Sequence, residues 1–188
     1  FLEKVSVNFE YVDFGGGMGI DYNSTKKTFD FKKLSLEIHK FSKRNECKVI
    51  LEPGRSIVGD TAVLISKVIY IKENPNKDFI ILDAGMNDLI RPALYNAKHM
   101  IIPANKSNRK SKKEYDFVGP ICETSDRFLK MKKFQKLNEG EIVILKDVGA
   151  YGYVLSSNYN VRPMPKEILV DKSKTQIISK RQSIKDLI

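Results

Sequence analysis

Hydrophobic positions along the chain follow two different spacings, and the change falls near residue 59. Alternating apolar residues over 5–14 predict a strand that ends at a run of glycines. Residues 30–44 instead repeat apolar side chains every three or four positions, which predicts an amphipathic helix with Asp30 as its N-cap. A short apolar strand over 48–51 follows. Strand, glycine turn, helix and strand form a βαβ unit, which implies parallel strands.

Beyond residue 59 the pattern is typical of short strands separated by turns, with little helix. A short helix near Met86–Tyr95 and a terminal helix over Ser179–Ile188 are the helical segments that we expect there. The sequence thus predicts an α/β fold for residues 1–59, followed by an all-β C-terminal domain over 60–188 that is a β-sandwich or barrel-like. The predicted strands cover residues 62–71, 78–83, 115–118, 141–145 and 167–170.

The βαβ unit needs more protein around it than these residues supply. Both faces of a parallel sheet are normally covered by helices, and a single unit cannot cover its own two faces. The sequence also starts at Phe1, without an initiator methionine. We therefore expect this chain to be the C-terminal part of a longer protein.

Composition places the chain among ordinary folded proteins and excludes several classes. Hydrophobic residues make up 41% of the 188, enough to bury a core. No run of about 18 apolar residues is present, so we expect no membrane-spanning helix. The two cysteines, Cys47 and Cys122, lie far apart and form neither a disulfide framework nor a zinc motif. This usage favours a reducing cytoplasm and no bound metal.

The net charge of +10 raises the question of a nucleic-acid partner. Lysines are spread along most of the chain, and the one dense basic stretch is the segment 105–113. That segment holds no aromatic residue to stack on a base and shows no helical period. A solvated loop is the better interpretation, so we expect no nucleic-acid partner.

Two glycine-bearing turns, each at the end of a predicted strand, are candidates for phosphate binding. Gly15-Gly16-Gly17-Met18-Gly19 follows the first strand, and glycine lets backbone N–H groups come close to an anion. Its spacing matches neither a dinucleotide fingerprint nor a P-loop, so a plain tight turn stays open. Glu52-Pro53-Gly54-Arg55 ends the second strand, and a structural turn with a surface arginine is the alternative. The last two strands of a (β/α)8 TIM-type barrel often end in phosphate-binding loops, and the two turns fit that position.

Two aromatic positions and one arginine suit the recognition of a ligand. Arg91 and Tyr95 lie four residues apart, so on a helical turn they would share a face suited to a carboxylate. A solvated arginine beside a packed tyrosine is the alternative. Tyr151 stands between two glycines, and a core tyrosine is its alternative. We assign no role to His39 or His99.

A Gly-Pro loop over residues 119–126 places a thiol beside carboxylates. Cys122 is suited to donate a proton, and Glu123 is suited to bind an ammonium group. Most lone cysteines are inert buried residues, and that alternative stays open here.

The order of these motifs, from Phe9 to the end of the chain, resembles the diaminopimelate decarboxylases, which share a fold group with alanine racemase and ornithine decarboxylase. The closing segment 181–188 resembles the C-terminus of that family. The resemblance implies pyridoxal 5'-phosphate as cofactor and a homodimer with shared active sites. It implies decarboxylation of meso-2,6-diaminopimelate to L-lysine and carbon dioxide, the last step of lysine biosynthesis. The lysine that forms the Schiff base would precede Phe1, so we expect the 188 residues alone to be inactive.

The resemblance also implies roles for individual residues. Glu52 would face the pyridine nitrogen of the cofactor and keep it protonated. Cys122 would be the catalytic residue that protonates the α-carbon, on a loop that reaches the partner subunit and that Asp126 supports. Glu123 would bind the distal ammonium group. The implied cofactor-binding residues are Gly15, Gly16, Gly17, Glu52, Gly54, Arg55 and Tyr151, and the implied substrate-binding residues are Arg55, Arg91, Tyr95, Glu123 and Tyr151.

Other substrates and another class of function stay open. Cys122 is followed by Glu123, whereas similar ornithine enzymes carry Asp there, and this difference favours diaminopimelate. The alternatives are ornithine, arginine or carboxynorspermidine as substrate, or a non-catalytic remnant of such an enzyme.

Overall fold

Two short parallel strands and one helix make up the N-terminal region in the computed structural model, which describes residues 8–22, 25 and 28–188. Strand β1 (Tyr11–Asp13) pairs in parallel with β2 (Lys48–Ile50), so that Val12 lies opposite Val49. Helix α1 (Phe31–Asn45) connects them. The predicted βαβ unit is therefore confirmed, although residues 5–7 of the predicted first strand lie outside the described residues.

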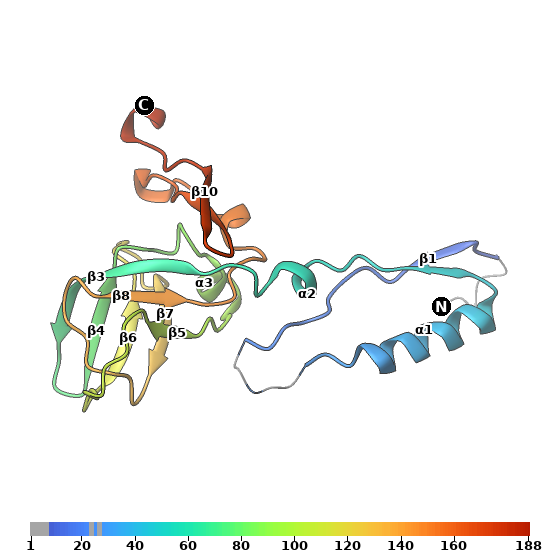
Figure 1. The fold of residues 1–188 in the computed structure, drawn as a ribbon, viewed down its shortest axis with the longest axis horizontal. Helices are drawn as coiled ribbons and strands as arrows, with labels where there is room; N and C mark the ends of the chain where they lie inside the picture. The colour runs from blue at the N-terminus through green and yellow to red at the C-terminus, as the bar shows by residue number, and fades with distance from the viewer. Residues whose placement is uncertain (1–7, 23–24, 26–27) are drawn as a thin grey trace.

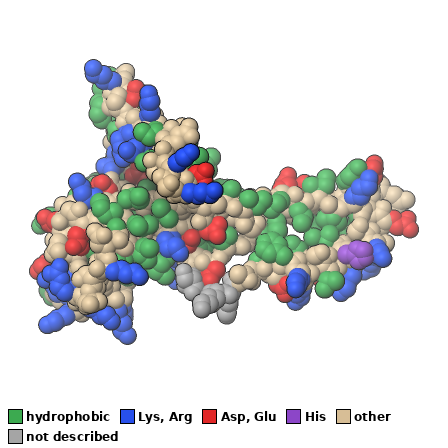
Figure 2. All heavy atoms as spheres, viewed as in Figure 1, with side chains coloured by type: hydrophobic (Ala, Val, Ile, Leu, Met, Phe, Trp, Pro, Cys, Tyr) green, Lys and Arg blue, Asp and Glu red, His purple; other side chains and the backbone are tan. Residues whose placement is uncertain are grey.

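Helix α1 begins and ends where its capping residues predict. The Asp30 side chain accepts a hydrogen bond from the backbone N–H of Lys33 at 2.9 Å, and Glu46 ends the helix in the left-handed conformation. None of the residues of α1 is buried. Its apolar side is at most partly covered, and one contact is made by Phe14, whose ring centroid lies 4.8 Å from that of Phe41. Hydrophobic side chains accordingly gather on the surface of this region (Figure 2).

A single six-stranded sheet is the largest element of the remaining described chain and is joined to the N-terminal region through α2 (Arg55–Val58) (Figure 1). Its strand order is β5-β8-β3-β4-β6-β7, and only β4 and β6 run parallel. The strands are β3 (Leu64–Glu73), β4 (Lys77–Leu82), β5 (Ile101–Pro103), β6 (Glu114–Val118), β7 (Arg127–Met131) and β8 (Ile142–Leu145).

The long strand β3 makes this sheet curl. Its residues 64–67 pair with β8, whereas residues 68–73 pair with β4, and the register shifts between Val68 and Tyr70. A bulge of this kind bends a strand and increases its twist. The structure thus agrees with the barrel-like prediction for this region. The described residues form one curled sheet here, and the two facing sheets of a sandwich are absent from them.

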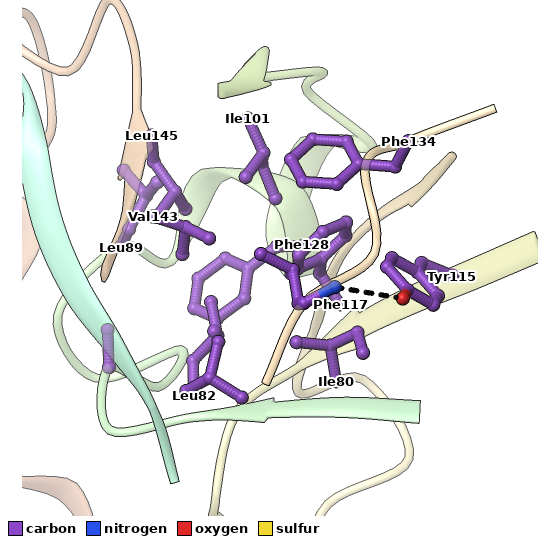
Figure 3. Packing of buried hydrophobic residues seen from close by; sticks show 13 residues of the cluster. Ile80, Leu82, Leu89, Ile101, Tyr115, Phe117, Phe128, Phe134, Val143 and Leu145 are labelled. Atoms are coloured by element: carbon purple, nitrogen blue, oxygen red, sulfur yellow. Dashed lines mark hydrogen bonds between the residues drawn. The ribbon is translucent and has the colours of Figure 1, made fainter. Parts of the chain in front are cut away.

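The core lies on the inner side of the curled sheet (Figure 3). Phe117 is fully buried, and its ring centroid lies 5.2 Å from that of Phe134 in an edge-to-face arrangement. The buried Tyr115 hydroxyl accepts a hydrogen bond from the backbone N–H of Leu137 at 3.2 Å, so its polar end is satisfied. Other members with no exposed surface are Val68, Ile80, Leu82, Val143 and Leu145.

Three strands were not predicted, and one predicted helix is wrong. Strands β5 and β7 belong to the sheet, and β10 (Lys174–Ser179) forms a hairpin with β9 (Glu167–Asp171). The predicted helix over Ser179–Ile188 is replaced by the end of β10 and one 3-10 turn, η4 (Ile184–Asp186). Only Ser179 of this segment pairs in the hairpin, and Ile184 and Ile188 stay exposed, so the segment has no buried apolar face to stabilise a helix. The expected helix near Met86–Tyr95 is shorter, α3 (Arg91–Tyr95).

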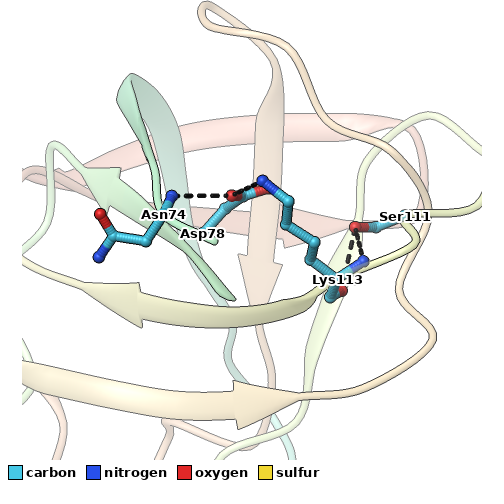
Figure 4. A network of polar contacts seen from close by, with 4 residues as sticks. All are labelled: Asn74, Asp78, Ser111 and Lys113. Atoms are coloured by element: carbon cyan, nitrogen blue, oxygen red, sulfur yellow. Dashed lines mark hydrogen bonds and ion pairs between the residues drawn. The ribbon is translucent and has the colours of Figure 1, made fainter. Parts of the chain in front are cut away.

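The basic segment 105–113 is a loop that is tied to the sheet at its end (Figure 4). The Lys113 ammonium group lies 3.1 Å from a carboxylate oxygen of Asp78, and the same oxygen accepts from the backbone N–H of Asn74. The Ser111 hydroxyl accepts from the backbone N–H of Lys113. None of the helices in the described part of the chain is long and apolar enough to cross a membrane.

Candidate active site

An open pocket of about 730 Å³ lies where the N-terminal region meets the sheet region. It brings together four of the predicted ligand-binding residues, two arginines and two tyrosines, from segments far apart in the sequence. The residues that line it are Tyr22, Arg55, Arg91, Tyr95, Asn96, Ala97, Lys98, Tyr151 and Leu155.

Arg91 is the most enclosed charged group of this pocket, with 5% of its surface exposed. One of its terminal nitrogens, Nη1, donates to the Tyr22 hydroxyl at 2.8 Å and lies 3.0 Å from Nε2 of His99. The guanidinium also lies over the Tyr22 ring, 5.1 Å from the centroid. The alternative of a solvated arginine beside a packed tyrosine is wrong, because Arg91 is buried and Tyr95 is exposed.

Arg55 and Tyr151 form the second part of the pocket. The Arg55 guanidinium lies 5.9 Å from the centroid of the Tyr151 ring, and its buried Nε has no hydrogen-bond partner among the described residues. Tyr151 has a φ of 59°, a left-handed conformation that is uncommon for tyrosine and that recurs at ligand sites. The structure places Tyr151 at the surface, so it is not a core tyrosine.

A close approach of backbone to backbone sets this geometry. The Gly149 N–H donates to the Gly59 carbonyl at 3.1 Å, at the end of α2. A Cβ atom at position 149 would lie 1.8 Å from the carbonyl oxygen of Val58. Only glycine therefore fits here, and its absence of a side chain lets the Tyr151 loop lie against the helix that carries Arg55.

The two glycine-bearing turns lie side by side, as their positions after parallel strands predict. The Glu52 N–H donates to the Gly15 carbonyl at 2.8 Å, and a Cβ atom on Gly16 would lie 2.3 Å from the Glu52 carbonyl oxygen. The Gly15 N–H is already engaged by the Asp13 carboxylate at 2.7 Å. No partner occurs among the described residues for the N–H groups of Gly16 and Gly17. Space is open at Gly17 and Gly54, where a Cβ atom would meet nothing within 4 Å.

Cys122 and Glu123 lie outside this pocket, on an exposed loop. The exposure of Cys122 argues against the alternative of an inert buried cysteine. The Glu123 carboxylate accepts a hydrogen bond from the Tyr159 hydroxyl at 2.5 Å. This contact raises the pKa of Tyr159, because ionising the phenol would place a second negative charge beside the carboxylate.

Asp126 holds this loop in place. Its carboxylate accepts from the backbone N–H groups of Met86 and Ile121, each at 2.7 Å, and so joins the Cys122 loop to the turn before α3. Burial raises the pKa of Asp126, although both N–H groups oppose the shift. Asp88 in the same turn also has a raised pKa, chiefly through burial.

Sequence patterns did not point to Tyr22, His99 or Tyr159. His99 is buried, with 1% of its surface exposed, although we assigned it no role. The one available signal is that Arg91, Tyr95 and His99 recur at intervals of four. The helix ends at Tyr95, however, so no helical face carries all three. In the described part of the chain no three His, Cys, Asp or Glu side chains are grouped to hold a metal ion.

Residues 18–149 match the family described as pyridoxal-dependent decarboxylase, C-terminal sheet domain. The chain belongs to this family. The match covers the curled sheet and every residue of the pocket up to Gly149. The resemblance seen in the motifs is thereby confirmed at the level of the family.

Named relatives narrow the comparison within the pyridoxal-dependent decarboxylases. The chain is 42% identical to a diaminopimelate decarboxylase of Aquifex aeolicus over 97% of its own length and 43% of that protein's length. A diaminopimelate decarboxylase of Archaeoglobus fulgidus is 40% identical over 100% of this chain and 46% of its own length. The chain therefore spans less than half the length of these curated relatives.

A solved structure agrees with the fold. The crystal structure of diaminopimelate decarboxylase from Helicobacter pylori, complexed with L-lysine, superposes with a TM-score of 0.84 at 39% identity. The superposition covers 95% of this chain and 43% of that one.

Proposed function

We propose that this chain is the C-terminal part of a decarboxylase that converts meso-2,6-diaminopimelate to L-lysine and carbon dioxide with pyridoxal 5'-phosphate. The observation that carries the proposal is the meeting of Arg55, Arg91, Tyr95 and Tyr151 in one pocket. Two guanidinium groups beside two phenols suit an amino acid that carries a second carboxylate, because guanidinium binds a carboxylate through paired hydrogen bonds.

The residues fit the cofactor at its phosphate end. The N–H groups of Gly16 and Gly17 have no partner among the described residues, and the space at Gly17 and Gly54 is open. The buried, unpartnered Nε of Arg55 needs an acceptor, which an anionic group would provide. Since Asp13 already engages the Gly15 N–H, the proposed cradle uses the next two glycines for direct contacts. When bound, the cofactor supplies an electron sink for the pair released with carbon dioxide.

The remaining roles are those that the resemblance to the family implies, and they are proposed here for the matching residues. Glu52 keeps the pyridine nitrogen protonated, and Tyr151 contacts cofactor and substrate. Arg91 and Tyr95, with Arg55, hold the distal carboxylate. Glu123 holds the distal ammonium group.

Cys122 donates a proton to the α-carbon from the partner subunit. A homodimer is supported by the exposure of Cys122 and by its position outside the pocket of its own chain. A second copy would bring the missing thiol and carboxylate to each pocket.

We infer that residues 1–59 are the end of a (β/α)8 barrel and that residues 60–188 are the C-terminal β domain. Parallel β1 and β2, each followed by a glycine turn, support this boundary, as does the exposed apolar surface of α1. The same proposal places the enzyme in the cytoplasm.

The experiment that tests the function uses the full-length protein that contains this chain. With pyridoxal phosphate we expect release of carbon dioxide and L-lysine from meso-diaminopimelate, at a kcat/KM at least about tenfold above that for ornithine, arginine or carboxynorspermidine. A preference for any of these three would reject the substrate. The 188 residues alone should show no turnover, and decarboxylation by them would reject their assignment as an incomplete site.

A further inference from the structure

Arg91 divides its donors between the protein and the pocket. Both of its contacts within the described residues use the same nitrogen, Nη1, which carries two hydrogens. No described residue forms a hydrogen bond with Nη2 or Nε of Arg91, and Arg91 lines the pocket. The edge of the guanidinium formed by Nη2 and Nε is therefore left for a ligand. This edge offers two parallel N–H groups, the geometry that binds a carboxylate through both oxygens.

Only one form of His99 accepts a hydrogen bond from Arg91. Nδ1 of His99 lies 2.9 Å from the carbonyl oxygen of Lys146, and a carbonyl cannot donate, so Nδ1 carries the hydrogen. Nε2 of a neutral ring is then an acceptor, and it faces Nη1 of Arg91 at 3.0 Å. Burial lowers the pKa of His99, and the positive charge of Arg91 lowers it further, so the neutral form is favoured. The two hydrogen bonds therefore run in one direction: Arg91 donates to His99, and His99 donates to the Lys146 carbonyl.

Tyr22 closes the other side of Arg91. Its hydroxyl accepts the second Nη1 hydrogen, and its ring packs edge-on against His99 with centroids 5.3 Å apart. Tyr22 comes from the N-terminal region, whereas His99 follows α3 in the sheet region. Arg91 is therefore held between one acceptor from each region, which fixes the plane of the guanidinium.

We propose that His99 is a positioning residue for substrate recognition: its Nε2 accepts from Arg91 and so aims the free edge of the guanidinium at the ligand's distal carboxylate. The inference rests on the proposed function for the identity of that carboxylate. It assigns to a buried histidine a part in selecting ligands that carry this group.

The test uses two amide substitutions that each keep one of the two histidine contacts. In His99→Gln the side-chain oxygen reaches the position of Nε2 and still accepts from Arg91. In His99→Asn the shorter amide still donates to the Lys146 carbonyl, but it does not reach Arg91. Both variants leave a polar group in the same buried space. His39, exposed on α1, provides the control His39→Asn.

The full-length protein is titrated with L-lysine, which retains a carboxylate, and with cadaverine, which has none. For His99→Asn we expect the dissociation constant of L-lysine to rise at least about tenfold, because Arg91 loses its aim. The dissociation constant of cadaverine should stay within about twofold of the wild-type value, because cadaverine has no carboxylate to lose an interaction with Arg91. His99→Gln and His39→Asn should bind both ligands as the wild type does. In turnover, His99→Asn should raise KM for meso-diaminopimelate more than it lowers kcat.

Two results would overturn the proposal. One is equal L-lysine binding by the Gln and Asn variants, and the other is a parallel loss of L-lysine and cadaverine, which a purely structural histidine would give. Failure of the proposed function is distinct, because it appears as absence of diaminopimelate turnover in the wild type. The ratio between the two ligands still reports on the Arg91 edge in that case.

Discussion

The N-terminal region and the sheet region both carry clear hydrophobic patterns, but they bury their apolar side chains to very different extents. In the described part of residues 8–59 only Met18 and Cys47 are buried hydrophobic residues, and α1 buries none. In the sheet region Phe117, Val68, Ile80, Leu82, Val143 and Leu145 lose all their exposed surface. A hydrophobic pattern therefore predicts which face will be buried, but burial also requires a partner surface. The sheet finds one by curling on itself, whereas a single βαβ unit has none of its own.

The largest expected effect contrasts two phenylalanines. Phe117→Ala should lower the free energy of unfolding by about 3–5 kcal/mol, because it opens a cavity in the core. Phe31→Ala, at an exposed position on α1, should change it by less than about 1 kcal/mol. Urea unfolding followed by circular dichroism measures both. Similar losses for the two variants would mean that the regions share one core.

A second contrast concerns the buried carboxylate of Asp126. Asp126→Asn should cost about 2 kcal/mol, since the two N–H groups bond different carboxylate oxygens and the amide NH2, a donor, replaces one of these acceptors. The N-terminal Asp13, an exposed acceptor for Gly15, is the matched control, and Asp13→Asn should cost much less.

The pH dependence of Asp126 has a definite sign. Because burial raises its pKa in the folded state, the folded protein binds this proton more tightly than the unfolded chain. The resulting stabilisation is fully present below the ordinary pKa of 3.8 and is lost as the pH rises through the raised value. The stability difference between wild type and Asp126→Asn should therefore be largest in acid and shrink toward neutral pH. A difference that grows with pH would show that the pKa is lowered instead.

Ion pairs of the sheet region give a smaller contrast. Lys77 pairs at 2.9 Å with Asp116, a carboxylate with no exposed surface, which Arg127 also contacts at 3.0 Å. Lys77→Met should cost about 1–2 kcal/mol, because the buried charge keeps only one partner. Lys113→Met removes a more exposed pair with Asp78 and should cost less than about 1 kcal/mol. The order of the two values, measured by urea unfolding, tests whether burial of the carboxylate sets the effect.

The smallest effect is expected in the basic segment 105–113. Replacing the exposed Lys110 and Lys112 by Gln should change the free energy of unfolding by less than about 0.5 kcal/mol. DNA binding by the wild type should be absent or weak. Binding that weakens steeply with salt, and that the double substitution removes, would instead make this segment a nucleic-acid site.

Local sequence patterns predicted those strands and helices that form from signals within their own residues. Alternation located β3, β4, β6, β8 and β9, and capping located α1. Strands β5, β7 and β10 were not predicted, and β5 is only three residues long, too short to show an alternation. The terminal helix was wrong because Ile184 and Ile188 stay exposed, and a short helix without a buried apolar face is not stable.

The candidate site divides in the same way. Arg55, Arg91, Tyr95 and Tyr151 stand out as residue types in motifs, and the structure places them in one pocket. Tyr22 and His99 matter because each contacts Arg91. Tyr22 lies 69 positions before Arg91 in the sequence and His99 lies 8 positions after it, so no local pattern predicts these contacts. The roles of Cys122 and Glu123 remain predictions, because both residues lie outside the pocket and their roles rest on the proposed homodimer.

The position of the pocket at the junction of two regions has a thermodynamic consequence. Tyr22 and Arg55 come from one side of the junction, and Arg91, Tyr95 and Tyr151 come from the other. A ligand that contacts both sides binds only to the joined arrangement, so by linkage its binding free energy also strengthens the attachment of one region to the other. Raising the ligand concentration should then slow proteolysis at the connecting residues that follow Arg55 in α2.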